Sequence, residues 1–302
     1  MPPETATAAP VVWTIRALLT WTTDFLAKKG IDSPRLDAEL LLAHVLHCNR
    51  IDLIVRYSEE PTAAERTGFR ELVMKRAERW PTAYLIGKRE FYLLSFEVTP
   101  AVLVPRPDTE TLVLKAMDLL KGIPHPKVLE LGTGSGCVAV SLAHMCKIAN
   151  VTAVDISPDA LDVAKRNAVK HGVADRITFL LGDWYAPVPD GETFDLIVSN
   201  PPYIPPAELA ELAPEVRDHE PRLALDGGPD GLAFYRRLAM GLSTYLKPGG
   251  TIAVEIGSTQ ESDVRAIFAD TPGLSNIQLF KDMANRPRVV TASYRRTETP
   301  AR

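Results

Sequence analysis

Short apolar runs alternate with helix-like stretches from residue 107 onward. Apolar runs of about four to eight residues, bounded by glycine, proline or polar residues, are typical of buried strands. Amphipathic stretches lie between most of these runs, and such alternation favours a parallel sheet with helices on both faces. The expected strands are residues 127–131, 150–154, 176–181, 194–199, 250–256, 276–280 and 288–294.

The first part of the chain has a helical pattern. Two stretches repeat their apolar residues with helical spacing, which predicts helices that each present one stripe to a core. A short helix over residues 52–57 and a longer one over residues 61–80 are expected to follow. From Tyr84 to Thr99 the pattern changes toward alternation around Gly87-Lys88, which indicates a β-hairpin. The two stripes are Trp13, Ala17, Leu18, Trp21 and Phe25, and Leu36, Leu40, Ala43 and Leu46.

A proline-rich segment, residues 100–107, separates the two patterns. We therefore expect a helical domain over residues 1–82 and a β-hairpin with a linker over residues 83–106. Residues 107–302 are expected to form an α/β domain. The strand pattern predicts a Rossmann-like fold with a mostly parallel, seven-stranded sheet, because strands alternate with helices throughout this part.

A glycine loop follows the first strand of the α/β domain. Glycines permit unusual φ values and close approach of the backbone to a ligand, and the helix that follows offers free N–H groups. A dinucleotide-binding loop carries its third glycine one residue later than this chain does. The spacing therefore favours another adenosine-containing ligand over a nicotinamide dinucleotide. The loop consists of Gly132, Thr133, Gly134, Ser135 and Gly136.

Acidic residues end the next two strands. Asp155 stands about 20 residues after the glycine loop, where a carboxylate suits contact with ribose hydroxyls. It could instead cap the following helix, but Ser157-Pro158 supplies a better helix start. Asp183 and Trp184 follow the third strand, where the acid could meet an adenine amino group and the indole could cover the ring. A large ring at a strand end also serves plain packing.

The strand over residues 194–199 runs directly into Asn200, Pro201, Pro202 and Tyr203. Neither proline has an N–H to donate, and Pro201 biases Asn200 toward an extended conformation. These four residues, called the platform below, offer one amide, carbonyls free of the sheet and one ring. Carbonyl oxygens can accept both hydrogens of a flat NH2 group, which a nitrogen methyltransferase must bind. A proline pair after a strand is also a common stop signal.

These features resemble the class I S-adenosylmethionine-dependent methyltransferases and, more narrowly, the release-factor glutamine methyltransferases of the PrmC/HemK family. The likeness covers nearly the whole chain. Asp108 stands where the family usually has Glu, and Asn285 stands where it prefers Gly. The matching segments are residues 91–98, 104–110, 130–136, 200–203, 220–232, 255–257 and 281–288.

The resemblance implies transfer of a methyl group from S-adenosyl-L-methionine to the side-chain amide nitrogen (N5) of a protein glutamine. That glutamine would belong to the Gly-Gly-Gln motif of peptide-chain release factors. The platform residues would be catalytic. The glycine loop, Asp155, Asp183, Trp184 and Asn200 would bind the cofactor. We expect the helical domain to bind the release factor, because one buried glutamine side chain offers little contact for selectivity.

Three other functions remain open. An enzyme that methylates adenine N6 or guanine N2 in nucleic acid would use the same platform. The net charge of −4 argues against it, since residues 1–90 hold 13 Lys and Arg against 12 Asp and Glu and the rest holds 21 against 26. Neither part has the basic stripe of a nucleic-acid binder. The complete platform argues against a noncatalytic adenosine-ligand sensor, and the glycine spacing argues against a nicotinamide oxidoreductase.

Bulk features indicate a cytoplasmic protein. No apolar run approaches the roughly 18 residues of a membrane span, and the first ten residues lack the pattern of a secretory signal. Cys48, Cys137 and Cys146 form no Cys-x-x-Cys pair and fit reduced thiols. The six histidines show no metal-ligand spacing, so no metal is expected. The sequence predicts neither stable nucleic-acid binding nor an oligomeric state.

Overall fold

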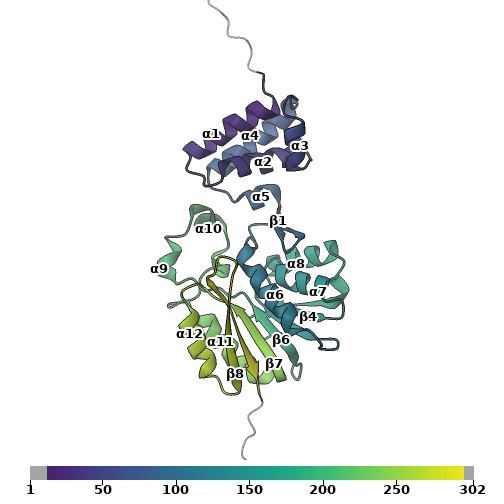
Figure 1. The fold of residues 1–302 in the computed structure, drawn as a ribbon, viewed down its shortest axis with the longest axis vertical. Coiled ribbons are helices and arrows are strands. Elements are labelled where there is room, and N and C mark those ends of the chain that lie inside the picture. The colour runs from purple at the N-terminus through teal and green to yellow at the C-terminus, as the bar shows by residue number, and fades with distance from the viewer. Residues whose placement is uncertain (1–11, 296–302) are drawn as a thin grey trace, which may run out of the picture. The chain divides into compact units, whose positions relative to one another are not determined.

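The structure is a computed structural model of the 302-residue chain, and it describes residues 12–295. The chain divides into two compact units, Met1–Ile86 and Gly87–Arg302 (Figure 1). The first ten residues, where no secretory signal is expected, lie outside the described part. Across the described residues, no helix combines the length and the apolar character needed to cross a membrane.

The first unit is helical throughout its described part. Local signals set the helix starts: the Thr14 hydroxyl accepts the Ala17 N–H, and Thr62 and Glu65 form a reciprocal capping box. Gly30, with φ of 73°, follows the first helix in the left-handed conformation that favours glycine. The helices are α1 (Ile15–Lys28), α2 (Pro34–Val45), α3 (Arg50–Val55), α4 (Ala63–Ala77) and α5 (Thr82–Ile86).

The two stripes expected for the first helices are partly wrong. Trp21 is 50% exposed and Leu36 is 40% exposed, although both were assigned to the core. The helical periodicity was correct, but each helix has more than one apolar row. Which row packs into the core depends on the partner helices, and spacing alone does not show it. The buried core residues of these helices are Ile15, Leu18, Leu19 and Leu26 in α1 and Ala38, Leu41, Leu42 and Ala43 in α2.

The hairpin begins later than the sequence suggests. Strands β1 (Lys88–Phe91) and β2 (Leu94–Glu97) pair antiparallel, so the turn lies at Tyr92-Leu93 and not at Gly87-Lys88. Gly87 has φ of 70° and ends α5, which the alternation pattern missed because α5 is only five residues long. The hairpin packs within the second unit, where Phe91 and Phe96 are buried in its core.

The second unit is built on a seven-stranded sheet within the described residues. The strand order is β5-β4-β3-β6-β7-β9-β8. The strands from β5 to β7 in this order pair parallel with one another, and β9 pairs antiparallel with both β7 and β8. The expected sheet and its mostly parallel pairing are confirmed. The strands are β3 (Lys127–Leu131), β4 (Asn150–Asp155), β5 (Ile177–Leu181), β6 (Phe194–Ser199), β7 (Leu246–Glu255), β8 (Leu274–Lys281) and β9 (Pro287–Tyr294).

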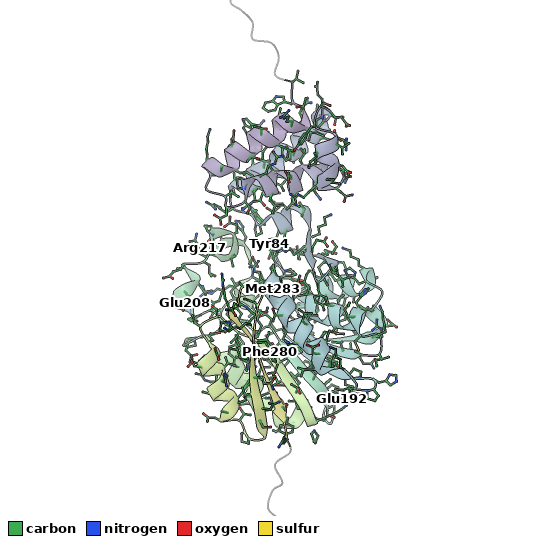
Figure 2. The ribbon with its side chains drawn as sticks, in the orientation of Figure 1. Tyr84, Glu192, Glu208, Arg217, Phe280 and Met283 are labelled. Atoms are coloured by element: carbon green, nitrogen blue, oxygen red, sulfur yellow. The ribbon has the colours of Figure 1, made fainter. Side chains whose placement is uncertain are left out.

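Helices cover both faces of this sheet (Figure 1). Alternate strand residues point to opposite faces, so Val128 joins one buried cluster while Leu129 joins the other. Figure 2 labels Phe280 on β8. On the first face, the Nζ of Lys115 on α6 lies 4.3 Å from the ring centre of Phe280. The first face carries α6 (Glu110–Leu119), α7 (Cys137–Met145) and α8 (Pro158–Lys170), and the second carries α11 (Ala233–Tyr245) and α12 (Glu261–Ala269).

Short elements fill the connections near the carboxyl ends of the parallel strands. Because those ends share one edge of the sheet, the loops that follow β3, β4, β5 and β6 gather there. In the described part these elements are 3₁₀ helices η1 (Pro107–Thr109) and η3 (Arg222–Ala224) and helices α9 (Pro206–Leu209) and α10 (Pro214–His219), whereas 3₁₀ helix η2 (Ala174–Arg176) lies at the amino end of β5.

Candidate active site

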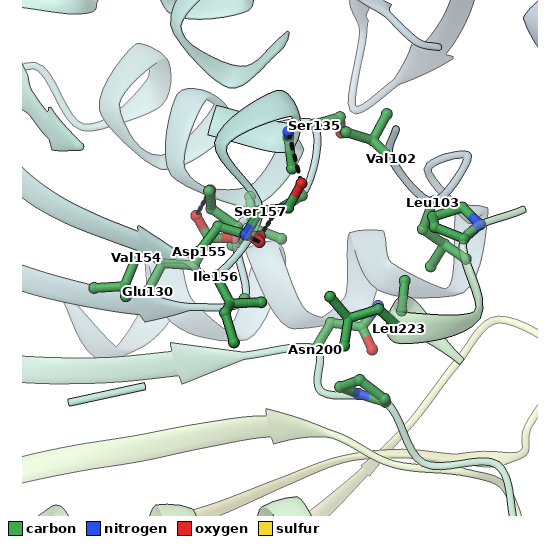
Figure 3. A pocket seen from close by; sticks show the side chains of 18 of the residues that line it. Val102, Leu103, Glu130, Ser135, Val154, Asp155, Ile156, Ser157, Asn200 and Leu223 are labelled. Carbon is green, nitrogen blue, oxygen red and sulfur yellow. Dashed lines mark hydrogen bonds between the residues drawn. The ribbon is translucent and has the colours of Figure 1, made fainter. Parts of the chain in front are cut away.

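A cavity of about 360 Å³ opens at the carboxyl ends of β3, β4, β5 and β6 (Figure 3). Its wall combines loops from these strands with η1, η3 and the start of α11. Gly136, Pro201 and Tyr203 are not among the described residues that line it. The other candidate site residues do line it: Gly132, Thr133, Gly134, Ser135, Asp155, Asp183, Trp184, Asn200 and Pro202.

The glycine loop forms a backbone cradle on the cavity wall. Gly132 and Gly134 have φ of 77° and 55°, and a Cβ built on either would meet no atom of the described chain within 4 Å. The N–H groups of Gly132 and Thr133 donate to the carbonyl of Val154, at 2.9 and 3.0 Å. The open space beside these two glycines leaves room for the close backbone approach that a bound ligand needs.

Gly136 serves packing. A Cβ at this position would lie 3.0 Å from the Cβ of Ala164 on α8. Its φ of 77° also places it where an L-residue is strained. Gly136 therefore lets α7 begin close against α8, which is the role of the last glycine in loops of this kind.

Asp155 organises the loop as well as lining the cavity. One carboxylate oxygen accepts the Gly134 N–H at 2.8 Å, and the other accepts the Ser157 N–H at 3.0 Å. Burial raises the pKa of Asp155, while these backbone hydrogen bonds act to lower it. The Ser157 hydroxyl caps α8 by accepting the Ala160 N–H at 3.2 Å, as the sequence predicts. Asp155 is thus separate from the helix cap.

Glu130 is a buried acid that the sequence reasoning placed in the loop motif but gave no role. Its carboxylate accepts the Thr133 hydroxyl at 2.5 Å and the Ala139 N–H at 3.1 Å, so it joins the loop to α7. Burial raises the pKa of Glu130 to about 8, against the lowering effect of these two bonds. The side chain lines the cavity, so a cation bound there would favour its ionised form.

The two side chains that follow β5, Asp183 and Trp184, both contact residues of α11. Asp183 forms an ion pair with Arg237 of α11 at 2.6 Å, and Arg237 also lies 5.6 Å from the ring centre of Trp184. Trp184 stacks on Phe234 with ring centres 5.1 Å apart. The indole therefore combines packing with a place on the cavity wall, and Phe234 and Arg237 join it there. Sequence reasoning missed these α11 residues because nothing local connects them to the β5 loop.

The amide of Asn200 is held from one side. Its Nδ2 donates to the hydroxyl of Thr109 at 3.2 Å, and both residues line the cavity. This bond leaves Oδ1 of Asn200 as the side-chain acceptor at the carboxyl end of β6. The position of Thr109, 91 residues earlier in the chain, could not be inferred from the platform itself.

The carbonyl end of the platform is clamped by a second loop. Gln260 Nε2 donates to the carbonyls of Tyr203 and Gly231, at 2.9 and 3.1 Å. A Cβ on Gly227 would lie 2.7 Å from the Tyr203 backbone, and one on Gly231 would lie 2.5 Å from the Tyr203 carbonyl oxygen. Both glycines are therefore required for this approach, which explains why the glycine-rich segment after residue 226 accompanies the platform.

Glu220 joins the loop that follows the platform to the proline-rich segment. Its carboxylate accepts the Val104 N–H at 3.0 Å and pairs with Arg106 at 2.6 Å. Arg106 also lines the cavity. The proline-rich segment, expected to act as a linker, is packed here, since Val102 and Val104 are buried.

A buried polar cluster lies behind the platform. Glu255, at the end of β7, is 1% exposed, and its Oε2 has no hydrogen-bond partner among residues 12–295. Burial raises the pKa of Glu255 to about 7, while a hydrogen bond from Thr109 and the charge of Arg288 act to lower it. Leaving such an acceptor unpaired costs about 1–3 kcal/mol.

Residues 12–295 hold no candidate metal centre, because no three of their His, Cys, Asp or Glu side chains are grouped to bind a metal ion. The chemistry of the cavity instead comes from backbone N–H groups, buried carboxylates and one oriented amide.

Comparisons with known proteins define the class first. Residues 128–219 match the profile of a methyltransferase domain, and residues 17–87 match that of a PrmC N-terminal domain. The hMettl16 catalytic domain, solved in complex with an RNA hairpin of the MAT2A 3′UTR, is 15% identical with a TM-score of 0.54. It covers 76% of this chain and 84% of that one, which supports the fold alone. The second unit is thus a methyltransferase domain of the class I fold.

Full-length relatives define the family. The release factor glutamine methyltransferase of Rhodopirellula baltica is 44% identical over 95% of this chain and 98% of that protein. The enzyme of the same name from Geobacter sulfurreducens is 47% identical over 88% of this chain and 92% of that protein. The chain belongs to the release factor glutamine methyltransferase family, as its resemblance implied.

Both departures from the family pattern are accommodated locally. Asn285 has φ of 63°, in the left-handed region that asparagine tolerates better than most residues. Asp108 pairs with Arg288 at 2.9 Å. Neither change reaches the cavity wall.

Proposed function

We propose that this protein transfers a methyl group from S-adenosyl-L-methionine to the side-chain amide nitrogen of the glutamine in the Gly-Gly-Gln motif of peptide-chain release factors. The observation that carries the proposal is the Asn200 amide, whose Nδ2 is engaged by Thr109 at 3.2 Å. Its Oδ1 is then the acceptor presented to a substrate NH2 group. The names of the relatives supply the class of substrate.

The platform would act by positioning. An amide nitrogen is a poor nucleophile, because its lone pair is delocalised into the carbonyl group. If Asn200 Oδ1 and the Pro201 carbonyl accept its two N–H bonds, the nitrogen is held in one orientation and its developing positive charge is stabilised. Burial raises the pKa of Tyr203 to about 12, so its phenol stays neutral and does not serve as a base. The proton can leave the nitrogen after transfer.

The residues of the cavity fit the cofactor. The empty cradle at Gly132 and Gly134 suits close backbone contact, and the Asp155 carboxylate suits hydroxyl donors. Glu130 and Asp155 also place acidic groups beside a ligand that carries a cationic sulfonium. When bound, S-adenosyl-L-methionine supplies the electrophilic methyl group. Gly136, Pro201 and Tyr203 would act from behind the cavity wall, through helix packing and the platform backbone.

We also propose that the helical unit recognises the release factor. The proposal keeps the domain boundaries expected from the sequence, after residues 82 and 106. Two aromatic side chains of α1, Trp21 and Phe25, lie beside Trp13, which precedes the helix. Trp21 stacks on Phe25 with ring centres 5.1 Å apart, and its edge meets Trp13 at 6.4 Å. Trp21 is 50% exposed, and exposed tryptophan rings are frequent anchors of protein interfaces.

Labelled methyl transfer tests the function. Purified protein with tritiated S-adenosyl-L-methionine should label a release factor at the Gly-Gly-Gln glutamine and leave tRNA and DNA unlabelled. Trp21→Ala should raise KM for intact release factor about tenfold, as the loss of an interface anchor does, and leave the rate on a short Gly-Gly-Gln peptide unchanged. Thr20→Ala, an exposed change on the same helix, is the control. Labelling of nucleic acid in place of protein would refute the proposal.

A further inference from the structure

One side-chain amide on α8 joins the β-hairpin to the glycine loop. The Oδ1 atom of Asn167 accepts the N–H of Glu97, the last residue of β2, at 2.7 Å, and its Nδ2 donates to the carbonyl of the same residue at 3.0 Å. Nδ2 also donates to the carbonyl of Ser135 in the glycine loop, at 2.9 Å. The Asn167 side chain is fully buried, so these three contacts are shielded from water.

The three contacts require the side chain of asparagine. A primary amide has two N–H donors on one atom and an acceptor on the other, and Asn167 uses all of them here. Because one partner is an N–H and two are carbonyls, the amide has only one favourable orientation. Toward Glu97 it makes the two hydrogen bonds that a residue of a neighbouring strand would make. Alanine would leave three buried backbone groups without a partner.

One face of α8 supports both the loop and the hairpin, which lies beside α8 in Figure 1. Ala164, Asn167 and His171 are three and four positions apart and therefore share a face of the helix. Gly136 packs against Ala164, and Nε2 of His171 lies 2.9 Å from the carbonyl oxygen of Ser95 on β2. Asn167 lies between these two contacts and is the residue that bonds both sides.

The shape of the glycine loop depends on contacts from outside the loop, because glycine has little conformational preference of its own. On the strand side, its N–H groups donate to the Val154 carbonyl and the Asp155 carboxylate. On the α8 side, Asn167 holds the Ser135 carbonyl and so fixes the peptide group between Ser135 and Gly136. Ser135 lines the cavity, so a rotation of this peptide would change the cavity wall.

We propose that Asn167 is a positioning residue for cofactor binding, which holds the glycine loop in its binding geometry and couples the loop to the β-hairpin. The proposal rests on the function proposed above, which names the cofactor. Asn167 is not among the described residues that line the cavity, so it acts through Ser135. Because coupling between two sites is reciprocal, an occupied cavity should stabilise the hairpin, and an attached hairpin should favour cofactor binding.

Calorimetry with S-adenosylhomocysteine on the full-length protein tests the first half of the proposal. Asn167→Asp keeps the shape of the side chain but has at most one donor in place of two. Its affinity should be about tenfold lower than that of wild type, within the range of about 5- to 150-fold that is common for coupled sites. At saturating S-adenosyl-L-methionine, kcat on a release factor should stay within about twofold, because the platform is untouched.

Arg166→Ala is the matched control on the same helix. Arg166 pairs with the side chain of Glu97 at 2.8 Å, and none of its described hydrogen bonds reaches the glycine loop. The affinity of this variant should stay within about twofold of wild type. An unchanged affinity in Asn167→Asp, or an equal loss in Arg166→Ala, overturns the positioning role, because the bond to Ser135 would then not matter.

Hydrogen exchange in the wild type tests the coupling without any substitution. The amide of Glu97 donates to Asn167, whereas the amide of Tyr92, in the same hairpin, donates to Glu110 of α6 at 2.9 Å. Saturating S-adenosylhomocysteine should slow exchange of the Glu97 amide about tenfold more than that of the Tyr92 amide, as followed by NMR. An equal change at the two amides, or no change at either, overturns the coupling.

The two proposals can fail separately. A wild-type protein that shows the Glu97 response to S-adenosylhomocysteine but labels no release factor would refute only the proposed function. A protein that methylates a release factor at its glutamine without that response would refute only the coupling by Asn167.

Discussion

The two ends of the cavity are built in different ways. At the glycine-loop end, Gly134 and Asp155 lie 21 positions apart and belong to one strand-helix-strand unit. At the platform end, Asn200 is held by Thr109 from 91 positions away, and Tyr203 by Gln260 from 57 positions away. The glycine-loop end is formed by backbone N–H groups and carboxylates that are close together in the sequence. The platform end is assembled only when the whole unit has folded.

This difference predicts a difference in function. Changes at the glycine-loop end should alter affinity for the cofactor, since that end supplies the cradle. Changes at the platform end should alter kcat, since that end supplies orientation and charge stabilisation. A glycine-loop variant that changes only kcat, or a platform variant that changes only cofactor affinity, would contradict this difference. Kinetic and binding measurements are therefore made together.

Asn200→Ala should have the largest effect. It removes the oriented side-chain acceptor of the platform, and loss of one such preorganised hydrogen bond costs about 10²–10³ in rate. Affinity for S-adenosylhomocysteine, measured by calorimetry, should change little, because the cradle is untouched. Asn150→Ala, at the exposed start of β4, is the matched control. A kcat within about threefold of wild type would remove Asn200 from the reaction.

Asp155→Ala and Gly134→Val should weaken cofactor binding. The loss of hydrogen bonds to the Asp155 carboxylate costs about 1.5–3 kcal/mol, or about 10- to 150-fold in affinity. Gly134→Val should be more severe, because it strains a residue with φ of 55° and fills the empty cradle. Gly122→Val provides the control, since Gly122 has φ of 79° and equally open space away from the cavity. Equal affinities in wild type and both site variants would refute the cradle.

The same contrast explains what the sequence could predict. Strands β3 to β6 were predicted almost to the residue, because they are short apolar runs with clear polar ends, whereas β7 begins at Leu246, four residues before the expected start. The glycine loop and Asp155 were found because their roles depend on local spacing. Thr109 and Gln260 were not assigned any role, since a buried threonine or glutamine has no sequence signal until the loops that surround it are placed.

The helical unit shows a further limit. Its helices were expected from periodicity, yet the exposed row with Trp21 was assigned to the core. A helix with several apolar rows does not reveal which row packs inward, because that choice depends on the partner helix. Asp37, buried in an ion pair with Arg76 at 2.7 Å, is a polar core position that no hydrophobic pattern indicates.

Gln260→Met should have a moderate effect on rate. The substitution keeps the length of the side chain but removes both donors to the Tyr203 and Gly231 carbonyls. We expect the free energy of unfolding to fall by about 1–3 kcal/mol. Because a looser platform orients the nucleophile less well, kcat should fall about 3- to 10-fold, with cofactor affinity unchanged. Gln278→Met on β8 is the control. A changed affinity with an unchanged kcat would break the comparison between the two ends.

Cofactor binding should be linked to the loss of a proton from Glu130. Because burial raises the pKa of Glu130 to about 8, the free protein carries this carboxyl mostly protonated at neutral pH. A cationic ligand in the cavity favours the ionised carboxylate, so binding should release a proton below about pH 8. Affinity for S-adenosyl-L-methionine should therefore rise from pH 6 to 8, by about one log unit per pH unit at most, and level off above pH 8.

The matched ligand S-adenosylhomocysteine lacks the sulfonium charge and should show a shallower rise. Calorimetry in phosphate and Tris buffers, whose heats of ionisation differ, counts the protons released. Glu130→Gln should remove the part of the release that belongs to Glu130, for both ligands. If both ligands release the same fraction of a proton in the wild type, the sulfonium lies too far from Glu130 to affect it. The carboxyl would then act only as the joint between the glycine loop and α7.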